Sequence, residues 1–487
     1  MLTKRPTEIR ALTAVSMSTS LGFFLIFVVI GIVMRMNQAG IIKIEPERFY
    51  GLMTAHGLGM AASLFIASYT SAWYLLSKHV RVSTRLMWFV FFMNLLGFIG
   101  LLISTVIGNF GPGWYMLYPL PFILDSWHPY TVTLIIFALV FWGFSWLFIM
   151  LDILRAIGAE YGTSNMLGWQ YLKKNPADKK NISPLILISS VSSIAGIIAM
   201  FSGANLLILY LLKWENLNLD LDPLLLKNMV FLFGHTLVNI TLYYCIAGVY
   251  EILPKYTNRP WKTNKIVVYS WNVTLVLVIA AFFHHMIMDF DQAFSVQVIG
   301  QIASYVSCIP ATVVTVIGAF AQIYRSGMKF TFTPIILIFG LMGWSIGGFA
   351  AMVDSSIPIN VTFHNTLWVP GHFHTYFLMG VVFMLLGFMH YYSKDVPEKF
   401  AQLGNNEKAA KISLALMIFG GYGFVLMFFI AGASGVPRRF ADYSYIPLDF
   451  IRNIGIESGY YATMFAIVFL LGLIIRFKSF FRNKKIR

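Results

Sequence analysis

The stretch Val369-Pro370-Gly371-His372-Phe373-His374 lies inside an apolar segment at about residues 362–392. Two histidines two positions apart on a helix point roughly 200° apart, toward opposite sides of the helix. One metal ion therefore cannot bind both side chains, whereas two flat cofactors on either side of the helix would each take one. Other apolar segments carry the further histidines that such cofactors would need: His56, His235 and the adjacent His284 and His285.

The composition is that of a membrane protein. Hydrophobic residues make up 58% of the 487-residue chain and charged residues 11%, against about 25% charged in ordinary soluble domains. Apolar stretches long enough to cross a bilayer recur along the chain. They lie at about 11–35, 49–77, 85–109, 130–157, 183–213, 224–254, 264–288, 294–324, 331–353, 362–392, 410–433 and 457–477. We predict an all-α polytopic protein of twelve transmembrane helices, forming one membrane domain over residues 1–487.

The net charge of +15 is concentrated in short loops. In a soluble protein it would suggest nucleic acid, but here it indicates topology and a chain surrounded by membrane lipids. The basic residues lie in every second connection between the predicted spans: Lys78, Arg81, Arg85, Lys173, Lys174, Lys179, Lys180, Lys255, Arg259, Lys262, Lys265, Arg325, Lys329, Lys394, Lys399, Lys408 and Lys411. The positive-inside rule then places both termini in the cytoplasm. We expect the membrane to be the inner membrane of a prokaryotic cell. Arg438-Arg439 is the exception, in an external connection.

Six histidines share one predicted depth. His56 and His235 lie about seven and eleven residues into helices, His284 and His285 lie close to an external end, and His372 and His374 lie about ten and twelve residues into theirs. At 1.5 Å per residue, all fall in the outer half of the bilayer within roughly 10–15 Å. Helices that run in opposite directions have no reason to agree on depth by chance. The remaining histidines suit local hydrogen bonds or the membrane rims: His79, His128, His364 and His390.

Six imidazoles match a simple count of ligands. Neutral imidazole is the commonest biological metal ligand. A haem iron takes one or two axial ligands, and three histidines hold a redox-active copper or iron with an open position. Two haems and one further metal would therefore use all six. Cys245 and Cys308 offer no CxxC, CxxCH or disulfide framework.

Over essentially all twelve spans the chain resembles the catalytic subunit I of the haem-copper oxygen reductase and nitric oxide reductase superfamily, and most closely the B-type oxygen reductases. The matching stretches are Tyr50 to Gly57, Phe233-Gly234-His235, Phe283-His284-His285, His364 to His374 and Val436 to Arg439. The resemblance implies His56 and His374 as axial ligands of a low-spin haem. It implies His372 as proximal ligand of a high-spin haem, opposite a non-haem iron or copper on His235, His284 and His285. The two haems are expected to be of b type.

Paired guanidiniums suit haem propionates, which are carboxylates that arginine binds in a bidentate manner. Arg438 and Arg439 are the expected propionate partners, because ordinary loop arginines would conflict with the charge bias of the external connections. Tyr118 and His364 resemble outer-surface propionate contacts of the superfamily. Tyr250 resembles a residue of the B-type inward proton path, with Thr312 and Ser307 as companions, although a tyrosine near an interface is also commonly a plain anchor.

The chain departs from the oxygen reductases beside His235. Most of them carry a tyrosine one helical turn beyond this histidine, where this chain has Asn239; Tyr243 and Tyr244 lie a turn further on. C-type oxidases supply the tyrosine from the seventh span, but residues 276–283 contain none. Known nitric oxide reductases have a glutamate at the position of Asn239. Asn239 fits neither pattern, and its amide would be a weak iron ligand or a hydrogen-bond donor to bound nitric oxide.

Electron counting favours nitric oxide. Splitting dioxygen in one step takes four electrons, one of which the superfamily's tyrosine supplies, whereas coupling two nitric oxide molecules takes two. We therefore predict a respiratory nitric oxide reductase, with a cytochrome c or quinol oxidase as the alternative. A second subunit with a copper or c-type haem electron-entry site is expected, fed by cytochrome c or a quinol. A multi-pass transporter is the rival of another class, but transporters carry intramembrane carboxylates, and these spans are nearly free of Asp and Glu.

Overall fold

The computed structural model describes residues 4–123, 125–174, 180–395 and 407–481. Within these ranges, 12 helices are long and apolar enough to cross a membrane. Each coincides with a predicted span to within a few residues at most ends, so the prediction of an all-α polytopic chain is confirmed. Two of the lysines used for the topology, Lys179 and Lys399, lie outside the described residues, and the cytoplasmic placement of the termini stays a prediction.

The chain divides into two compact units. Unit 1 comprises Met1–Gly31, Ile44–Ala247 and Trp261–Thr315; unit 2 comprises Ile32–Lys43, Gly248–Pro260 and Val316–Arg487. The helices α1, α6 and α9 contribute residues to both units. The single membrane domain predicted from the sequence stays a prediction.

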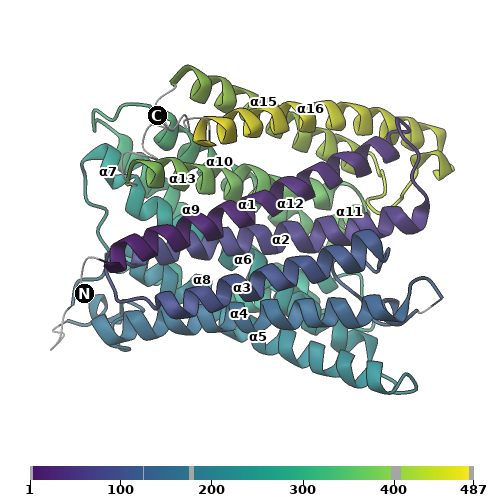
Figure 1. The fold of residues 1–487 in the computed structure, drawn as a ribbon, viewed down its shortest axis with the longest axis horizontal. Helices are drawn as coiled ribbons and strands as arrows, with labels where there is room; N and C mark the ends of the chain where they lie inside the picture. Colours follow the sequence, from purple (N-terminus) through teal and green to yellow (C-terminus); the bar gives the residue numbers. More distant parts are fainter. Residues whose placement is uncertain (1–3, 124, 175–179, 396–406, 482–487) are drawn as a thin grey trace. The chain divides into compact units, whose positions relative to one another are not determined.

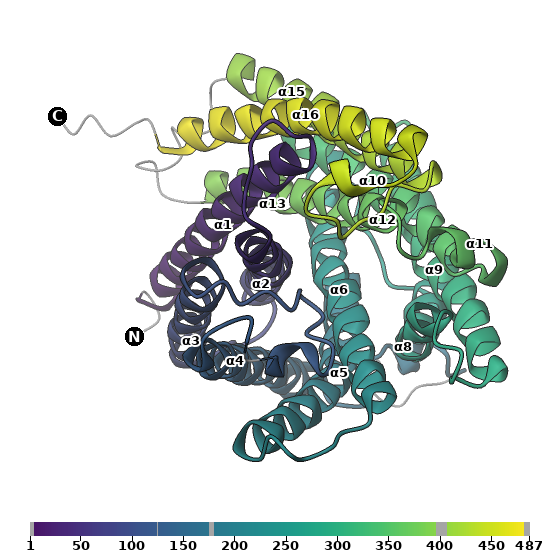
Figure 2. The same cartoon turned by 90° about the vertical axis from the view of Figure 1, so that its right-hand side faces the viewer.

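Among the described residues, unit 1 contains all or part of eight long helices. They are α1 (Lys4–Gln38), α2 (Pro46–Leu76), α3 (Thr84–Leu102), α4 (Pro129–Tyr161), α5 (Pro184–Glu215), α6 (Pro223–Ile252), α8 (Lys265–Ala281) and α9 (Phe294–Ile323). In Figures 1 and 2, α3 lies along α4, and α4 along α5. Prolines stand in the first turns of α2, α4 and α5, where the missing N–H costs no helical hydrogen bond. Short elements complete the unit: η1 (Ile103–Ile107), η2 (Leu120–Phe122), η3 (Trp169–Tyr171) and η4 (Phe282–Met286).

Unit 2 contains the HxH segment. Its elements are α7 (Pro254–Thr257), α10 (Phe332–Asp354), α11 (Ile357–Phe363), α12 (Trp368–His374), η5 (Thr375–Val382), α13 (Phe383–Asp395), α15 (Glu407–Ala433), η7 (Tyr443–Tyr445) and α16 (Asp449–Phe481). The helices α15 and α16 lie side by side (Figure 1). Their close approach requires Gly420, because a Cβ there would lie 2.5 Å from the backbone nitrogen of Phe469.

The helix of the HxH segment begins later than predicted. It starts at Trp368 rather than near residue 362, so His372 lies about one turn from its start. The cause is a non-local pairing: the Leu367 N–H donates to the Val436 carbonyl at 2.9 Å, and the Arg438 N–H donates to the Asn365 carbonyl at 3.0 Å. The chain before Trp368 therefore pairs with the loop after α15 instead of continuing the helix. After His374 the helix widens into the π-helix η5.

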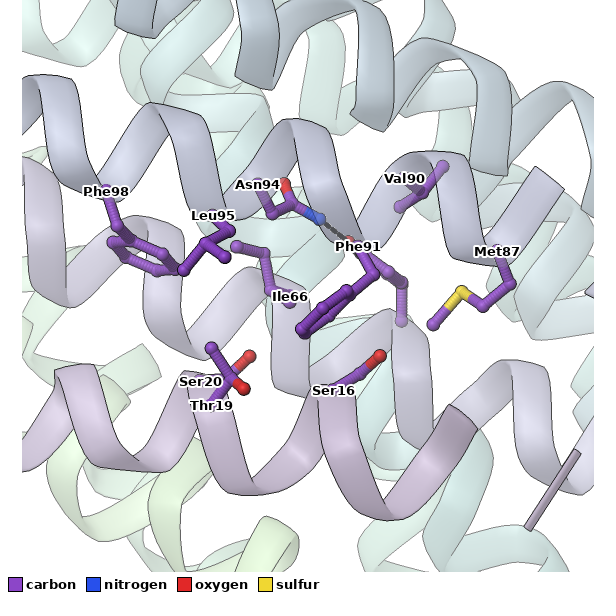
Figure 3. A pocket seen from close by; sticks show the side chains of 11 residues that line it. Ser16, Thr19, Ser20, Ile66, Met87, Val90, Phe91, Asn94, Leu95 and Phe98 are labelled. Atoms are coloured by element: carbon purple, nitrogen blue, oxygen red, sulfur yellow. Dashed lines mark hydrogen bonds between the residues drawn. The ribbon is translucent and has the colours of Figure 1, made fainter. Parts of the chain in front are cut away.

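A small cavity lies between α1, α2 and α3 of unit 1 (Figure 3). About 10 Å³ is open to the centre of a water molecule, which is room for roughly one water. Its polar lining includes Ser16, Ser20 and Asn94, and the Asn94 amide donates to the Tyr69 hydroxyl at 2.6 Å. The described residues that line it include no histidine, so this cavity is separate from the predicted metal sites.

Candidate metal and haem sites

Three histidines predicted to share a metal come together in unit 1. His235 lies on α6, and His284 and His285 lie on the 3-10 helix η4 that continues α8. One ring nitrogen from each lies within 4.8 Å of the others, and His235 Nδ1 is 3.3 Å from His285 Nε2. The ligand atoms of the trio thus converge on one place, as a shared metal ion requires.

Ser304 on α9 orients one of these ligands. Its Oγ lies 2.8 Å from His284 Nδ1 and also donates to the Gly300 carbonyl at 2.7 Å. A hydroxyl has one hydrogen, so if that hydrogen goes to Gly300, the serine oxygen accepts from His284 Nδ1–H. Nε2 of His284 then keeps its lone pair for a metal. Ser304 was missed from the sequence, because a serine in an apolar helix has no signal until its histidine partner is known.

Asn239 lies beside His235, one turn further along α6. Its Nδ2 is 3.2 Å from His235 Nε2 and donates to the His235 carbonyl at 2.8 Å. His235 Nδ1, on the other edge of the ring, lies toward His285 Nε2. The two tyrosines further along this helix make other contacts: the Tyr244 hydroxyl bonds to Ser193 at 2.8 Å, and the Tyr243 ring packs edge-on against Trp271.

The two histidines of the HxH segment are each oriented by a backbone carbonyl. His372 Nδ1 lies 2.8 Å from the Gly347 oxygen, and His374 Nδ1 lies 2.7 Å from the Pro370 oxygen. A carbonyl only accepts, so both Nδ1 atoms carry the proton and both Nε2 lone pairs stay available. This tautomer is the one that an axial ligand to haem iron needs.

His56 on α2 has the same arrangement in unit 1. Its Nδ1 donates to the Phe27 carbonyl of α1 at 2.8 Å. Gly31, one turn further on α1, leaves room for the ring, because a Cβ at this glycine would lie 2.6 Å from His56 Cε1. All three predicted haem ligands therefore fit a haem iron for the same reason: the backbone holds a protonated Nδ1, so that Nε2 carries the lone pair.

A buried arginine in unit 2 was not singled out from the sequence. Arg35 is 4% exposed, and its Nη1 donates to Gln38 and to the Tyr443 hydroxyl at 2.6 and 3.0 Å. Its Nε and Nη2 have no hydrogen-bond partner among the described residues. The guanidinium lies 4.7 Å over the ring of Phe428, which packs against His374 at 5.2 Å. Buried donors this close to a predicted haem ligand fit the oxygen atoms at a haem edge.

The predicted propionate residues lie in two places. In unit 2, Arg438 and Arg439 are half-buried on the loop that pairs with residues 365–367, next to His364, whose N–H donates to the Asn360 carbonyl. The buried carboxyl of Asp354 is close enough to Arg438 for electrostatic interaction. In unit 1, Tyr118 lies against Phe122, with the Lys213 ammonium 5.6 Å from its ring.

The predicted proton-path residues are also divided between the units. Tyr250 is buried on α6 in unit 2. Ser307 and Thr312 lie on the part of α9 that belongs to unit 1, where the Ser307 hydroxyl donates to the Ser304 carbonyl at 3.1 Å. Of the other histidines, His390 bonds to Thr333 at 2.6 Å and His128 caps α4, as expected for local roles.

Comparison with known proteins agrees with this arrangement. The sequence profile of the family described as cytochrome c and quinol oxidase polypeptide I matches residues 11–467. The chain is 25% identical to cytochrome c oxidase subunit 1 of Eremothecium gossypii over 359 residues, covering 70% of this chain and 62% of that protein. It is 24% identical to cytochrome c oxidase subunit 1 of Thermus thermophilus over 422 residues, covering 81% of this chain and 69% of that protein.

Other matches are shorter or show the fold alone. The match to cytochrome c oxidase subunit 1 of Candida albicans covers 46% of that relative's length, so the chain spans about half to two thirds of several curated relatives. A solved structure of a heme-copper terminal oxidase dimer superposes with a TM-score of 0.76 at 18% identity, covering 98% of this chain and 84% of that chain. Because the family profile spans nearly the whole sequence, the chain belongs to the cytochrome c and quinol oxidase polypeptide I family.

Proposed function

We propose that the chain is the catalytic subunit of a respiratory membrane reductase with two haems and one non-haem metal. His56 and His374 would hold a low-spin haem, His372 a high-spin haem, and His235, His284 and His285 a non-haem iron or copper. The metals would supply the electrons for reduction of a small gas molecule. The ligand tautomers set by Phe27, Gly347 and Pro370 support these assignments, because each places the lone pair on Nε2, the nitrogen that would bind iron.

Nitric oxide is the substrate that we propose. The reaction 2 NO + 2 H⁺ + 2 e⁻ → N₂O + H₂O needs two electrons, which a haem held by His372 and a metal held by the three histidines would supply together. Dioxygen cleavage needs four, and the phenol that would supply one is replaced by an amide: Asn239 lies 3.2 Å from His235 Nε2. An asparagine in contact with His235 is the observation that carries the proposal, because an amide cannot donate an electron as a phenol does.

Asn239 would have two roles. It would orient His235, and its amide would contact the bound substrate. With its amide beside Nε2, it would fix the orientation of the imidazole, whose Nδ1 lies 3.3 Å from His285 Nε2. For Nδ1 to bind the metal, the amide would have to turn so that its oxygen accepts the Nε2–H of His235. Neutral amide dipoles stabilise polar nitrogen oxides without offering a redox centre. We propose this orienting role in place of the covalently linked tyrosine of the oxygen reductases.

The second candidate function is reduction of dioxygen to water by a cytochrome c or quinol oxidase. The names of the matched relatives favour it, since several are cytochrome c oxidase subunits. In this case a redox donor other than the expected phenol would complete the four electrons, and the non-haem metal would be copper.

Charged residues would complete the haem sites. The free Nε and Nη2 donors of Arg35 would bind oxygen atoms at the low-spin haem edge, and Arg438 and Arg439 would bind haem propionates, with Tyr118 and His364 as further contacts. Tyr250, Ser307 and Thr312 would carry protons inward. Electrons would arrive from cytochrome c or a quinol through a second subunit with its own copper or c-type haem.

The experiment compares the purified wild-type complex with Asn239→Ala. We expect nitrous oxide production from nitric oxide to fall about 10–100-fold in the variant, as for other residues that orient metal ligands, while the optical spectra of both haems stay unchanged. Asn205→Ala is the matched control, because Asn205 is an exposed asparagine on α5 whose amide donates to the Phe201 carbonyl of the same helix. Wild-type nitric oxide turnover in Asn239→Ala would refute the role of Asn239. A wild-type complex without nitric oxide turnover would refute the proposed substrate.

A further inference from the structure

An ion pair closes the end of the metal-ligand cluster in unit 1. The Lys227 ammonium, on the second turn of α6, lies 2.6 Å from both carboxylate oxygens of Asp289. Asp289 follows the metal-ligand histidine His285 by four positions, on the loop that leaves η4. Both side chains are about four-fifths buried, with 22% and 21% exposure. A pair that is both bidentate and largely withdrawn from solvent is stronger than an ordinary surface ion pair.

The spacing on α6 places this pair in line with the metal ligand. Lys227, Phe231 and His235 are four residues apart and therefore share one helix face, about 6 Å apart along the axis. Each contacts the segment that carries the histidine pair: Lys227 binds Asp289, the Phe231 ring stacks on His285 at 4.9 Å, and His235 Nδ1 lies 3.3 Å from His285 Nε2.

The segment that carries His284 and His285 lies opposite this face of α6, and its position depends on such contacts. The α-helix α8 ends at Ala281, so His284 and His285 stand on a single 3-10 turn, which has weaker hydrogen bonds than an α-helix. Apolar packing of Phe231, Phe282 and Met286 holds one side of the turn. On the polar side, the Gln292 amide donates to Asn228 at 3.3 Å, next to the Lys227–Asp289 pair.

We propose that Lys227 and Asp289 are positioning residues for the non-haem metal. The ion pair fixes the loop after η4 to the start of α6, and so sets the distance between His235 and the histidine pair. This inference rests on the proposed three-histidine metal site. Without the pair, the turn that carries His284 and His285 moves more freely, and the three ligands hold the metal less tightly.

The test measures retention of the non-haem metal in the purified complex. Iron and copper are counted per two haems during dialysis against EDTA, for wild type, Lys227→Met, Asp289→Asn, Lys227→Arg and the exchanged pair Lys227→Asp/Asp289→Lys. We expect metal loss about tenfold faster in Lys227→Met and Asp289→Asn, near wild-type loss in Lys227→Arg, and slower loss in the exchanged pair than in Lys227→Met or Asp289→Asn. The low-spin haem spectrum should stay unchanged throughout.

Arg452→Met is the matched control, because it removes a cation from an ion pair with Asp449 in unit 2; its metal should be lost at the wild-type rate. Wild-type retention in both Lys227→Met and Asp289→Asn would overturn the inference. Loss of both haems together with the metal in these two variants would also overturn it, because the pair would then serve folding rather than the metal. A wild-type complex with no non-haem metal would instead refute the proposed metal site, and the inference with it.

Discussion

The three predicted haem ligands and the three predicted ligands of the non-haem metal are oriented in different ways. His56, His372 and His374 each donate Nδ1–H to a backbone carbonyl. In the trio, His284 bonds to the Ser304 side chain, His235 lies beside the Asn239 amide, and His285 stacks on Phe231. Backbone carbonyls persist through side-chain substitution, so the haem ligands are fixed by the fold. The trio depends on its neighbours' side chains, so its metal chemistry can change by single substitutions.

The largest expected effect comes from removing a backbone-oriented ligand. His56→Ala should abolish the low-spin haem spectrum, because no other side chain is proposed to ligate that face of the iron, while the high-spin haem on His372 remains. Optical and electron paramagnetic resonance spectra of the purified variant provide the measurement. An intact bis-histidine low-spin signal in His56→Ala would show that the ligand assignment is wrong.

A substitution in the space beside a haem ligand should have a smaller effect. Gly31→Ala places a Cβ 2.6 Å from His56 Cε1, which is closer than real contacts allow, so the ring or α1 must shift. We expect partial loss or a shifted spectrum of the low-spin haem. Gly22→Ala is the control on the same helix, because a Cβ there meets nothing within 4 Å. Identical spectra for both variants would contradict the tight fit of His56 against α1.

Removing a side-chain anchor of the trio should affect the non-haem metal alone. Ser304→Ala deletes the hydroxyl that contacts His284 Nδ1 at 2.8 Å, and loss of such a partner typically costs 10–100-fold in metal affinity. Metal analysis during chelator dialysis, with the haem spectra as reference, tests this. The haem spectra should not change. A loss of haem before loss of metal would contradict the distinction between the two groups of ligands.

The smallest effect is expected at the segment between α15 and α16 in unit 2. Burial raises the pKa of the Tyr443 phenol, while its hydrogen bond and the charge of Arg35 oppose the shift. Because the pKa is higher in the folded than in the unfolded protein, the stabilisation from the neutral phenol is fully present below about pH 10, the ordinary pKa of tyrosine. This stabilisation is lost as the pH rises through the higher pKa of the folded protein. Tyr443→Phe should therefore lower stability by about 1 kcal/mol, equally from pH 6 to 9. Thermal loss of the low-spin haem spectrum measures it, and a difference that shrinks over this range would contradict the assignment.

The sequence predicts the helices well and the orienting contacts poorly. The spans follow from apolar runs of fixed length, which are local properties of the chain. The start of α12 at Trp368 depends on pairing with Val436, and the role of Arg35 depends on Tyr443, 408 positions away. Contacts of this kind leave no local pattern.

The candidate sites show the same contrast between residues that a local pattern reveals and residues that only a non-local contact reveals. Histidines in apolar segments are rare enough to be selected from the sequence, and the structure brings His235, His284 and His285 within metal-binding reach. Ser304 and Lys227 look like any other serine or lysine until their partners are known. Asn239 was found from the sequence only because a familiar tyrosine was expected at its position.

The most direct test of the central claim compares two gases in one preparation. The purified complex, with the same electron donor, is supplied with nitric oxide or with dioxygen, and nitrous oxide production and oxygen consumption are measured per haem pair. Because Asn239 stands where a phenol would supply the fourth electron, we predict faster turnover of nitric oxide than of oxygen. Rapid four-electron reduction of oxygen with negligible nitric oxide turnover would contradict the account.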